Sequence, residues 1–203
     1  MAQKKGLHLL LEIPLIYNLI QWVFAHKRTN KAWCTLLKDH EDKIIVDIGC
    51  GPGNTSIFFK NSKKYIGIDM SEHCIRYAKK NYSKYGEFYC LQIEEIEKLP
   101  IKHIDIIILK GVFHHLPNSV IEEFLIKIKS KMSKKSTIFS IDPFLTNRKT
   151  LTNFVVSLDR GNFIRSKKGL IDIISNHMCI TSQQMIKQTA PPYQRILLAI
   201  KAR

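Results

Sequence analysis

A glycine-rich loop directly after a short apolar run constrains this chain more than any other feature. Residues 43–49 read KIIVDIG, a β-branched run typical of a buried strand, and residues 49–53 read GCGPG. Glycine adopts positive φ and lets backbone N–H groups approach a ligand without a Cβ in the way. We therefore expect a strand, then a ligand-contacting turn, then a helix whose N-terminus adds partial positive charge.

The rest of the chain alternates strand-like runs with helical patterns. Further strands are expected at residues 65–69, 87–93, 104–109, 137–142, 179–186 and 195–202. Such alternation produces right-handed crossovers and a parallel sheet covered by helices on both faces. The last two runs are joined around Pro191 and Pro192 without a helix, which predicts a hairpin and an antiparallel last strand. The expected fold is a doubly wound, mostly parallel, seven-stranded α/β sheet.

Two of the helices between these strands have clear signals. Residues 71–82 begin at Ser71, a favourable N-cap. Residues 118–132 follow Pro117 and should be capped by Asn118 or Ser119. In this second helix one apolar stripe has helical spacing. It consists of Ile121, Phe124, Leu125, Ile128 and Met132.

Composition indicates one globular domain. The chain has 203 residues, is 45% hydrophobic and 24% charged, and contains neither a repeat nor a low-complexity linker, so residues 1–203 are expected to form one unit. The five cysteines are odd in number, widely spaced and lack a C-x-x-C pair, which argues against a disulfide framework or a zinc site. Free thiols suit a reducing, cytoplasmic location.

The chain is strongly basic. Lys and Arg number 32 against 17 Asp and Glu, which gives a formal net charge of +15. Such a charge favours anionic partners, namely nucleic acid, anionic lipid or a phosphorylated substrate. The basic residues are scattered without a long block, so the simpler interpretation is a lysine-rich, solvated surface.

The most apolar segment is residues 7–25, LHLLLEIPLIYNLIQWVFA. Its length approaches that of a bilayer span, but Glu12, Asn18 and Pro14 interrupt it and both flanks are basic. We interpret residues 1–40 as N-terminal capping helices that close over the site. The second interpretation is an interfacial helix in peripheral contact with the inner membrane surface.

Two acids complete the pattern of the glycine loop. Asp47 lies two residues before Gly49, and Asp69 ends the next strand, 22 residues after Asp47. The spacing G-x-G-x-G fits neither the dinucleotide fingerprint nor the Walker pattern. A carboxylate beside the loop repels phosphate and suits a cationic amine, and an acid at the second strand tip accepts hydrogen bonds from ribose hydroxyls. The ligand inferred is a nucleoside with an ammonium group and no phosphate.

At these residues the chain resembles the class I S-adenosylmethionine-dependent methyltransferases. VDIGCGPG followed by YIGIDMS is similar to the first two motifs of that family, and the resemblance covers residues 43–142. It is similar to the small-molecule enzymes with methyltransferase domains of types 11 and 25. The resemblance implies a Rossmann-like fold, S-adenosylmethionine as methyl donor, S-adenosylhomocysteine as product and no metal. The implied cofactor residues are Asp47, Gly49, Cys50, Gly51, Asp69, Met70, Gln92, Ile93, Lys110 and Gly111.

The resemblance also assigns roles to these residues. In the family, residues 49–51 line the methionine portion of the cofactor, and Asp47 orients its amine. Asp69 would hold the ribose hydroxyls, and Met70 would lie against the adenine. The family usually has an acid after the third strand for the adenine amine, whereas this chain has Gln92 at or near that place. A glutamine carbonyl accepts the same hydrogen bond without a charge.

Residues 109–117, LKGVFHHLP, resemble the segment after the fourth strand of the small-molecule enzymes, whose backbone faces the cofactor. Methyl transfer from a sulfonium needs a base only when the nucleophile loses a proton, as a hydroxyl does. His114 and His115 are the candidate catalytic bases because imidazole titrates near neutrality. The alternative is that one of these two histidines packs into the turn between the fourth strand and the next helix. His115 is also a candidate for contact with the cofactor.

The segment 143–175 lies before the last two strands and is expected to form a substrate lid, as it does in the family. Arg160 and Arg165 fall in its polar stretch LDRGNFIRSKKGL and have the geometry to hold a carboxylate or phosphate. The alternative is an Asp-Arg surface pair. Tyr17 is the third candidate acceptor-binding residue. The segment more loosely resembles enzymes of cell-envelope and glycolipid metabolism.

The expected function is methyl transfer to a small-molecule acceptor through an oxygen or nitrogen nucleophile. The acceptor classes are a cell-envelope component, a glycolipid or a secondary metabolite. The run Ala190-Pro191-Pro192-Tyr193 is similar to an amino-methyltransferase motif, but it falls between the last strands and is interpreted as a turn. The alternatives are an RNA methyltransferase, motivated by the charge, and a non-catalytic cofactor-binding subunit. The sequence leaves the oligomeric state open.

Overall fold

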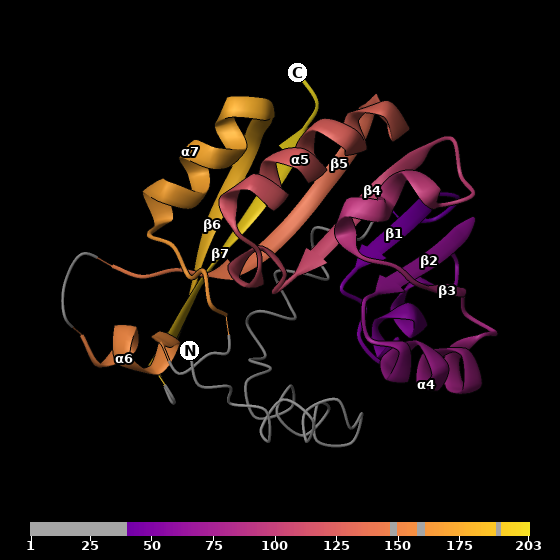
Figure 1. Ribbon diagram of the computed structural model, residues 1–203, viewed down its shortest axis with the longest axis horizontal. Coiled ribbons are helices and arrows are strands. Elements are labelled where there is room, and N and C mark those ends of the chain that lie inside the picture. The colour runs from indigo at the N-terminus through magenta and orange to yellow at the C-terminus, as the bar shows by residue number, and fades with distance from the viewer. Residues whose placement is uncertain (1–39, 147–149, 158–160, 190–191) are drawn as a thin grey trace.

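The computed structural model describes residues 40–146, 150–157, 161–189 and 192–203. Its centre is a seven-stranded sheet with the order β3-β2-β1-β4-β5-β7-β6 (Figure 1). The strands are β1 (Ile44–Ile48), β2 (Lys64–Asp69), β3 (Glu87–Cys90), β4 (Ile104–Lys110), β5 (Met132–Pro143), β6 (Cys179–Thr189) and β7 (Pro192–Lys201). The first five are parallel, and β7 is antiparallel to both β5 and β6. The predicted doubly wound sheet with an antiparallel last strand is confirmed.

The strand order reverses next to β1. From β1 the chain moves outward to β2 and β3, and it then returns to place β4 on the other side of β1. Open parallel sheets bind ligands outside the carboxyl ends of the strands at such a reversal. The glycine loop, which follows β1, therefore lies at the position where this fold forms a site.

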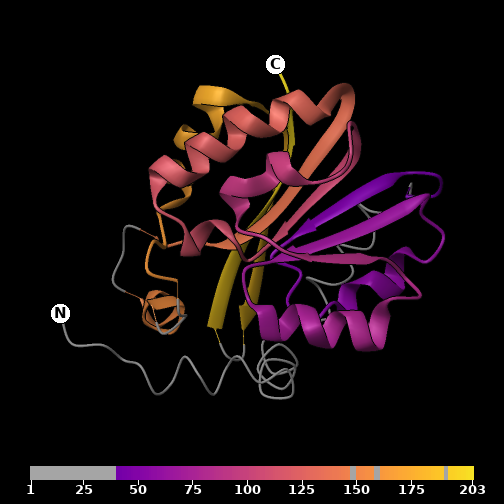
Figure 2. The ribbon, with the colours of Figure 1, turned by 45° about the vertical axis from the view of Figure 1, so that its right-hand side comes forward.

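Helices cover both faces of the sheet, as Figure 2 shows. The helices α5 (Asn118–Ile128) and α7 (Lys167–His177) cover one face together with the 3-10 helix η2 (Ile93–Lys98). The other face is covered by α4 (Glu72–Tyr82) and the 3-10 helix η1 (Asn54–Phe59). The short helix α6 (Leu151–Ser157) packs against β7. Most of α7 belongs to the predicted segment 143–175 and packs in the core. Within this segment an isolated β-bridge pairs Leu145 with Ser166.

Three predictions about the helices can be compared with the structure. Ser71 caps α4 as expected, since its hydroxyl accepts a hydrogen bond from the backbone N–H of Cys74. The second predicted helix ends at Ile128 rather than residue 132, because Met132 already pairs with Ile104 in the sheet. The predicted Asn118 or Ser119 cap of α5 is wrong, since Pro117 occupies the N-cap position without a side-chain bond.

The remaining differences lie at the ends of β1 and β3. The glycine loop leads into a 3-10 helix of six residues, η1, instead of an α-helix, so it contributes less of the expected helix dipole. The strand β3 ends at Cys90 instead of residue 93. There the backbone turns into η2, and the Glu95 carboxylate accepts a hydrogen bond from the N–H of Gln92.

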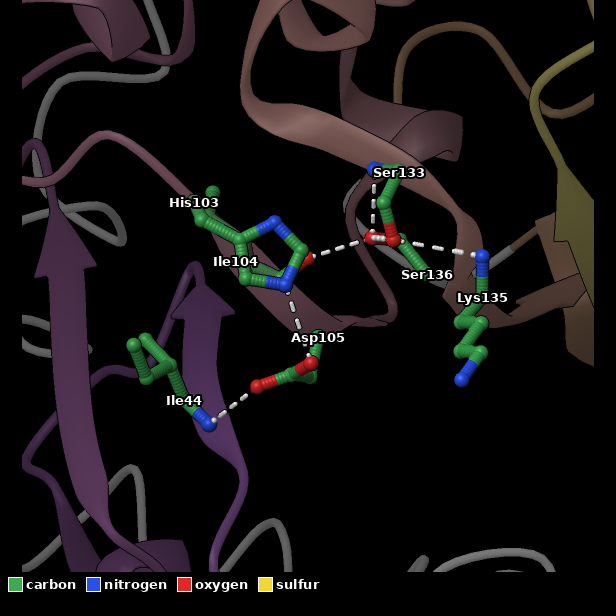
Figure 3. Close-up of polar contacts among 7 residues, drawn as sticks. All are labelled: Ile44, His103, Ile104, Asp105, Ser133, Lys135 and Ser136. Carbon is green, nitrogen blue, oxygen red and sulfur yellow. Dashed lines mark hydrogen bonds and ion pairs between the residues drawn. The ribbon is translucent and has the colours of Figure 1, made fainter.

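A polar network joins the amino ends of three parallel strands, as Figure 3 shows. The Asp105 carboxylate at the start of β4 accepts a hydrogen bond from the N–H of Ile44 in β1 and contacts the imidazole of His103. The buried hydroxyl of Ser136 in β5 donates to the carbonyl of Ile104. These bonds fix the strand register at the edge opposite the glycine loop.

Within the described ranges, no helix is both long enough and apolar enough to cross a bilayer. Residues 7–25 and the predicted capping helices of residues 1–40 lie outside these ranges, apart from His40.

Two isoleucines of α5 test the assignment of its buried face. Ile121 is fully buried, whereas Ile126 is 56% exposed. We expect Ile121→Ala to lower the free energy of unfolding by about 2–5 kcal/mol, because it leaves a cavity in the core. Ile126→Ala should change it by less than about 0.5 kcal/mol, and both variants gain the same helix propensity. Urea denaturation measures both, and equal effects would contradict the assigned face.

Candidate cofactor-binding site

The glycine loop is fixed by backbone geometry that requires glycine. Gly49, Gly51 and Gly53 have φ values of 69°, 55° and 82°, in the left-handed region that side chains disfavour. A Cβ at Gly49 would lie 2.8 Å from Val112, the second residue after β4. The backbone N–H groups of Gly49 and Cys50 both donate to the carbonyl of Ile68. The loop is therefore held between the carboxyl ends of β2 and β4.

Asp69 joins this loop to the second strand. Its Oδ2 accepts a hydrogen bond from the N–H of Gly51 at 2.8 Å, and its Oδ1 accepts one from the N–H of Ser71 at 2.8 Å. Burial raises the pKa of this carboxyl above its ordinary value, and the two backbone hydrogen bonds lower it. Each carboxylate oxygen has a second lone pair, so Asp69 can accept two further hydrogen bonds from a ligand.

Asp47 is the second acid of the site and is almost completely buried. The hydroxyl of Tyr65, from β2, donates to its Oδ2 at 2.6 Å. Burial raises the pKa of Asp47 to about 7, although the Tyr65 hydrogen bond and the charge of Lys110 lower it. Lys110, predicted as a cofactor residue, therefore acts on the electrostatics of Asp47 from the end of β4.

Four other predicted cofactor residues line the same strand ends. The side chain of Met70 is 77% exposed beside Asp69, and Gln92 is exposed after β3. Ile93, the first residue of η2, instead packs its side chain in the core. Gly111 has a φ of 71°, and its N–H donates to the carbonyl of Ile141 in β5.

The two histidines differ in their surroundings. His114 is 5% exposed, and its Nδ1 lies 2.9 Å from Oδ1 of Asp142, at the end of β5. The same oxygen accepts a hydrogen bond from the backbone N–H of His114 at 3.2 Å. His115 is exposed, and its ring centre lies 4.1 Å from that of His114. Asp142 thus holds His114 by both backbone and side chain.

Residues 161–165 cover His114. Gly161 lies so close that a Cβ there would overlap the imidazole ring, and the N–H of Phe163 donates to the carbonyl of His114. Arg165 donates to the carbonyls of Phe113, Phe163 and Leu116 and, through Nε, to the side-chain oxygen of Asn118. Four of its five N–H groups are therefore bound by protein acceptors, so Arg165 fastens this segment to the connection between β4 and α5.

The structure brings most predicted site residues to one edge of the sheet. The exceptions are Tyr17 and Arg160, which lie outside the described residues. Two residues that the sequence analysis missed also lie in the site, Tyr65 and Asp142. Asp142 has the signal that identified Asp47 and Asp69, because it is an acid at the end of an expected strand. Tyr65 has no such signal, because its sequence pattern indicates only a core residue of a strand.

Comparisons with known proteins identify the family of this arrangement. The model of the family described as "Methyltransferase domain" matches residues 39–188. An uncharacterized protein of Haemophilus influenzae is 32% identical over 112 residues, which are 51% of this chain and 43% of that protein. An uncharacterized protein of Methanocaldococcus jannaschii is 33% identical over 66 residues, 30% of each chain. The chain thus spans less than half the length of these two relatives.

Solved structures share the fold at low sequence identity. The YcgJ protein of Bacillus subtilis has a TM-score of 0.70 and 14% identity, over 88% of this chain and 99% of that one. A protein of Pyrococcus horikoshii also has a TM-score of 0.70 and 14% identity, over 87% and 90% of the two chains. The N-methyltransferase NodS of Bradyrhizobium japonicum, solved with S-adenosylhomocysteine, has a TM-score of 0.67 and 12% identity, over 87% and 86%.

Arg165→Lys tests the fastening role of the guanidinium. Lysine keeps the charge but cannot reproduce four hydrogen bonds in a planar fork. We expect the free energy of unfolding to fall by about 1–3 kcal/mol and the amide of Phe163 to exchange faster with deuterium. The matched control is Arg76→Lys, in an exposed ion pair with Glu72, which should change stability by less than about 0.5 kcal/mol. Unchanged exchange at Phe163 would contradict the role.

Proposed function

The chain belongs to the methyltransferase-domain family, and we propose that it is a class I enzyme that transfers a methyl group from S-adenosylmethionine to a small-molecule acceptor. The observation that carries this proposal is the Asp69 carboxylate. Bound on each oxygen by one backbone N–H group, it lies between the glycine loop and the start of α4. This is an acceptor placed for a ribose diol at the carboxyl edge of a reversed parallel sheet.

The residues present fit the cofactor. Asp69 would accept hydrogen bonds from the ribose hydroxyls. The loop of residues 49–51 would pass close to the methionine portion of the cofactor, because Gly49 and Gly51 have no Cβ. The buried Asp47 would hold the ammonium group, which offsets the cost of burying its charge. When bound, S-adenosylmethionine supplies an electrophilic methyl group on a sulfonium, so the protein aligns the acceptor and excludes water.

His114 and Asp142 support an acceptor that loses a proton. Nδ1 of His114 lies 2.9 Å from the Asp142 carboxylate, and in the neutral imidazole that donates from Nδ1 to this carboxylate, Nε2 is the acceptor atom of the ring. The ring carbons on either side of Nε2 face Gly111 and Gly161, so this nitrogen is directed between the end of β4 and the covering segment. An oxygen or nitrogen nucleophile that approaches there could transfer its proton to His114.

The placement of charge and cover supports a small acceptor over RNA. Residues 161–165 lie across His114, which is only 5% exposed, and this cover supports a small acceptor over a polynucleotide. Several exposed lysines stand at the amino ends of the strands, at the edge opposite the site. They include Lys43, Lys63, Lys102, Lys134 and Lys135. The net charge of +15 is the observation that favours RNA as the second candidate.

The free thiols of the described cysteines support activity in a reducing cytoplasm.

Asp69→Ala tests the assignment of the cofactor site. Calorimetric titration with S-adenosylhomocysteine should show binding to the wild type. The affinity of the variant should be at least about 10-fold lower, because the ribose hydroxyls lose their hydrogen bonds to a charged acceptor. The matched control is Asp172→Ala, an exposed acid paired with Lys168 on α7, which should bind as the wild type does. Equal affinity in all three proteins would contradict the assignment, and thermal unfolding shows whether Asp69→Ala is folded.

Methyl transfer from radiolabelled S-adenosylmethionine distinguishes the acceptor classes. We expect label in the small-molecule fraction of a cell extract and none in purified total RNA. Label in RNA, with affinity for RNA that falls steeply as salt rises, would favour the second candidate. Cofactor binding without transfer to either fraction would indicate the non-catalytic subunit.

A further inference from the structure

Tyr65 contacts the site from within the core. Its side chain is 2% exposed, and its hydroxyl lies 2.6 Å from Oδ2 of Asp47. Among the residues that the structure describes, Tyr65 is the only hydrogen-bond donor to this carboxylate. Burial raises the pKa of Tyr65 well above its ordinary value of 10, so the hydroxyl keeps its proton and donates. One oxygen of Asp47 is therefore fixed by the protein itself.

Tight packing surrounds Tyr65 and the neighbouring position of its strand. Gly67, on the same face of β2, pairs directly with Asp47 of β1. A Cβ at Gly67 would lie 2.7 Å from Phe88 and 2.8 Å from the sulfur of Cys50. The Tyr65 ring contacts those of Phe59 and Phe88, at centroid distances of 5.7 and 6.1 Å. The ring thus has two aromatic neighbours, and its hydroxyl reaches Asp47 past Gly67, which has no side chain.

The charged surroundings of Asp47 come from three elements. Tyr65 and Asp69 belong to β2, Lys110 to the end of β4 and Cys50 to the glycine loop, whereas η1 contains no titratable side chain. Burial is the largest effect and raises the pKa of Asp47 to about 7, while the Tyr65 hydrogen bond lowers it. Near neutrality, Asp47 is therefore divided between its neutral and ionised forms, and the hydroxyl favours the ionised form.

We propose that Tyr65 is a positioning residue for the cofactor, whose hydroxyl holds Oδ2 of Asp47 so that Oδ1 faces the ammonium group of S-adenosylmethionine. This inference rests on the proposed function. It explains why a polar tyrosine stands in an aromatic cluster of the core, where phenylalanine would pack equally well. It also gives the buried Asp47 two partners, the hydroxyl from the protein and the ammonium from the ligand.

A pH dependence follows from this arrangement. The ammonium group pairs with ionised Asp47, so affinity for S-adenosylhomocysteine should rise as the pH increases through about 7. It should fall again at higher pH, where the amino group of the ligand loses its proton. Without the Tyr65 hydroxyl the pKa of Asp47 is higher, so the first rise should move to higher pH.

Tyr65→Phe tests the proposal, with two ligands titrated by calorimetry at several pH values. S-adenosylhomocysteine contains the ammonium group, whereas 5′-methylthioadenosine keeps the adenine, ribose and sulfur but lacks the amino-acid portion. We expect the variant to bind S-adenosylhomocysteine about 5- to 30-fold more weakly at pH 7, and to bind 5′-methylthioadenosine as the wild type does. Tyr89→Phe, which removes an exposed 2.6 Å hydrogen bond to Glu87, is the matched control.

Other outcomes would overturn the proposal. Equal weakening for both ligands would show that Tyr65 supports only the fold, and unchanged binding of both would show that its hydroxyl plays no part. Asp47→Asn gives a second test, because it should remove the rise near pH 7, and adding Tyr65→Phe to it should cause no further loss. Absence of binding of either ligand to the wild type would instead contradict the proposed function itself.

Discussion

The site depends on the two backbone hydrogen bonds that the carboxylate of Asp69 accepts. This carboxylate bridges the N–H of Gly51 in the glycine loop and the N–H of Ser71 at the start of α4. Without that bridge, the loop after β1 and the connection after β2 would each carry an unsatisfied, partly buried donor and would lose their common anchor. Because β1 and β2 are parallel neighbours, one acid at a strand tip can fix two connections and still offer lone pairs to a ligand.

A second acid performs a similar task beside His114. Asp142, at the end of β5, binds His114 through its backbone and its ring, while Arg165 binds the carbonyls around His114 from the covering segment. In the described part of the chain, Oδ2 of Asp142 is buried without a hydrogen-bond partner. A buried carboxylate of this kind is costly unless nearby positive charge stabilises it, and the guanidinium of Arg165 acts on it electrostatically. At both places, therefore, an acid at the end of a strand binds backbone N–H groups and fixes a neighbouring connection of the sheet.

Much of this could be predicted from the sequence, because strand tips in a parallel sheet converge on one edge. Seven strands, the hairpin and the placement of Asp47 and Asp69 follow from local pattern and from that convergence. The end of α5, its cap and the role of Arg165 could not be predicted, because they depend on contacts between residues far apart in the chain. Asn118, for example, is a good cap by type, but its oxygen accepts from Arg165. Tyr65 was hidden for the same reason, since only the register of β1 and β2 shows that its hydroxyl reaches Asp47.

The most direct test of the account is a crystal structure of the protein with S-adenosylhomocysteine. We predict that the ligand lies at the carboxyl ends of β1, β2 and β4, with its ribose hydroxyls on Asp69 and its amino group within hydrogen-bond distance of Oδ1 of Asp47. The Tyr65 hydroxyl should remain on Oδ2. A ligand bound elsewhere, or bound at this edge with its ribose away from Asp69, would contradict the central claim.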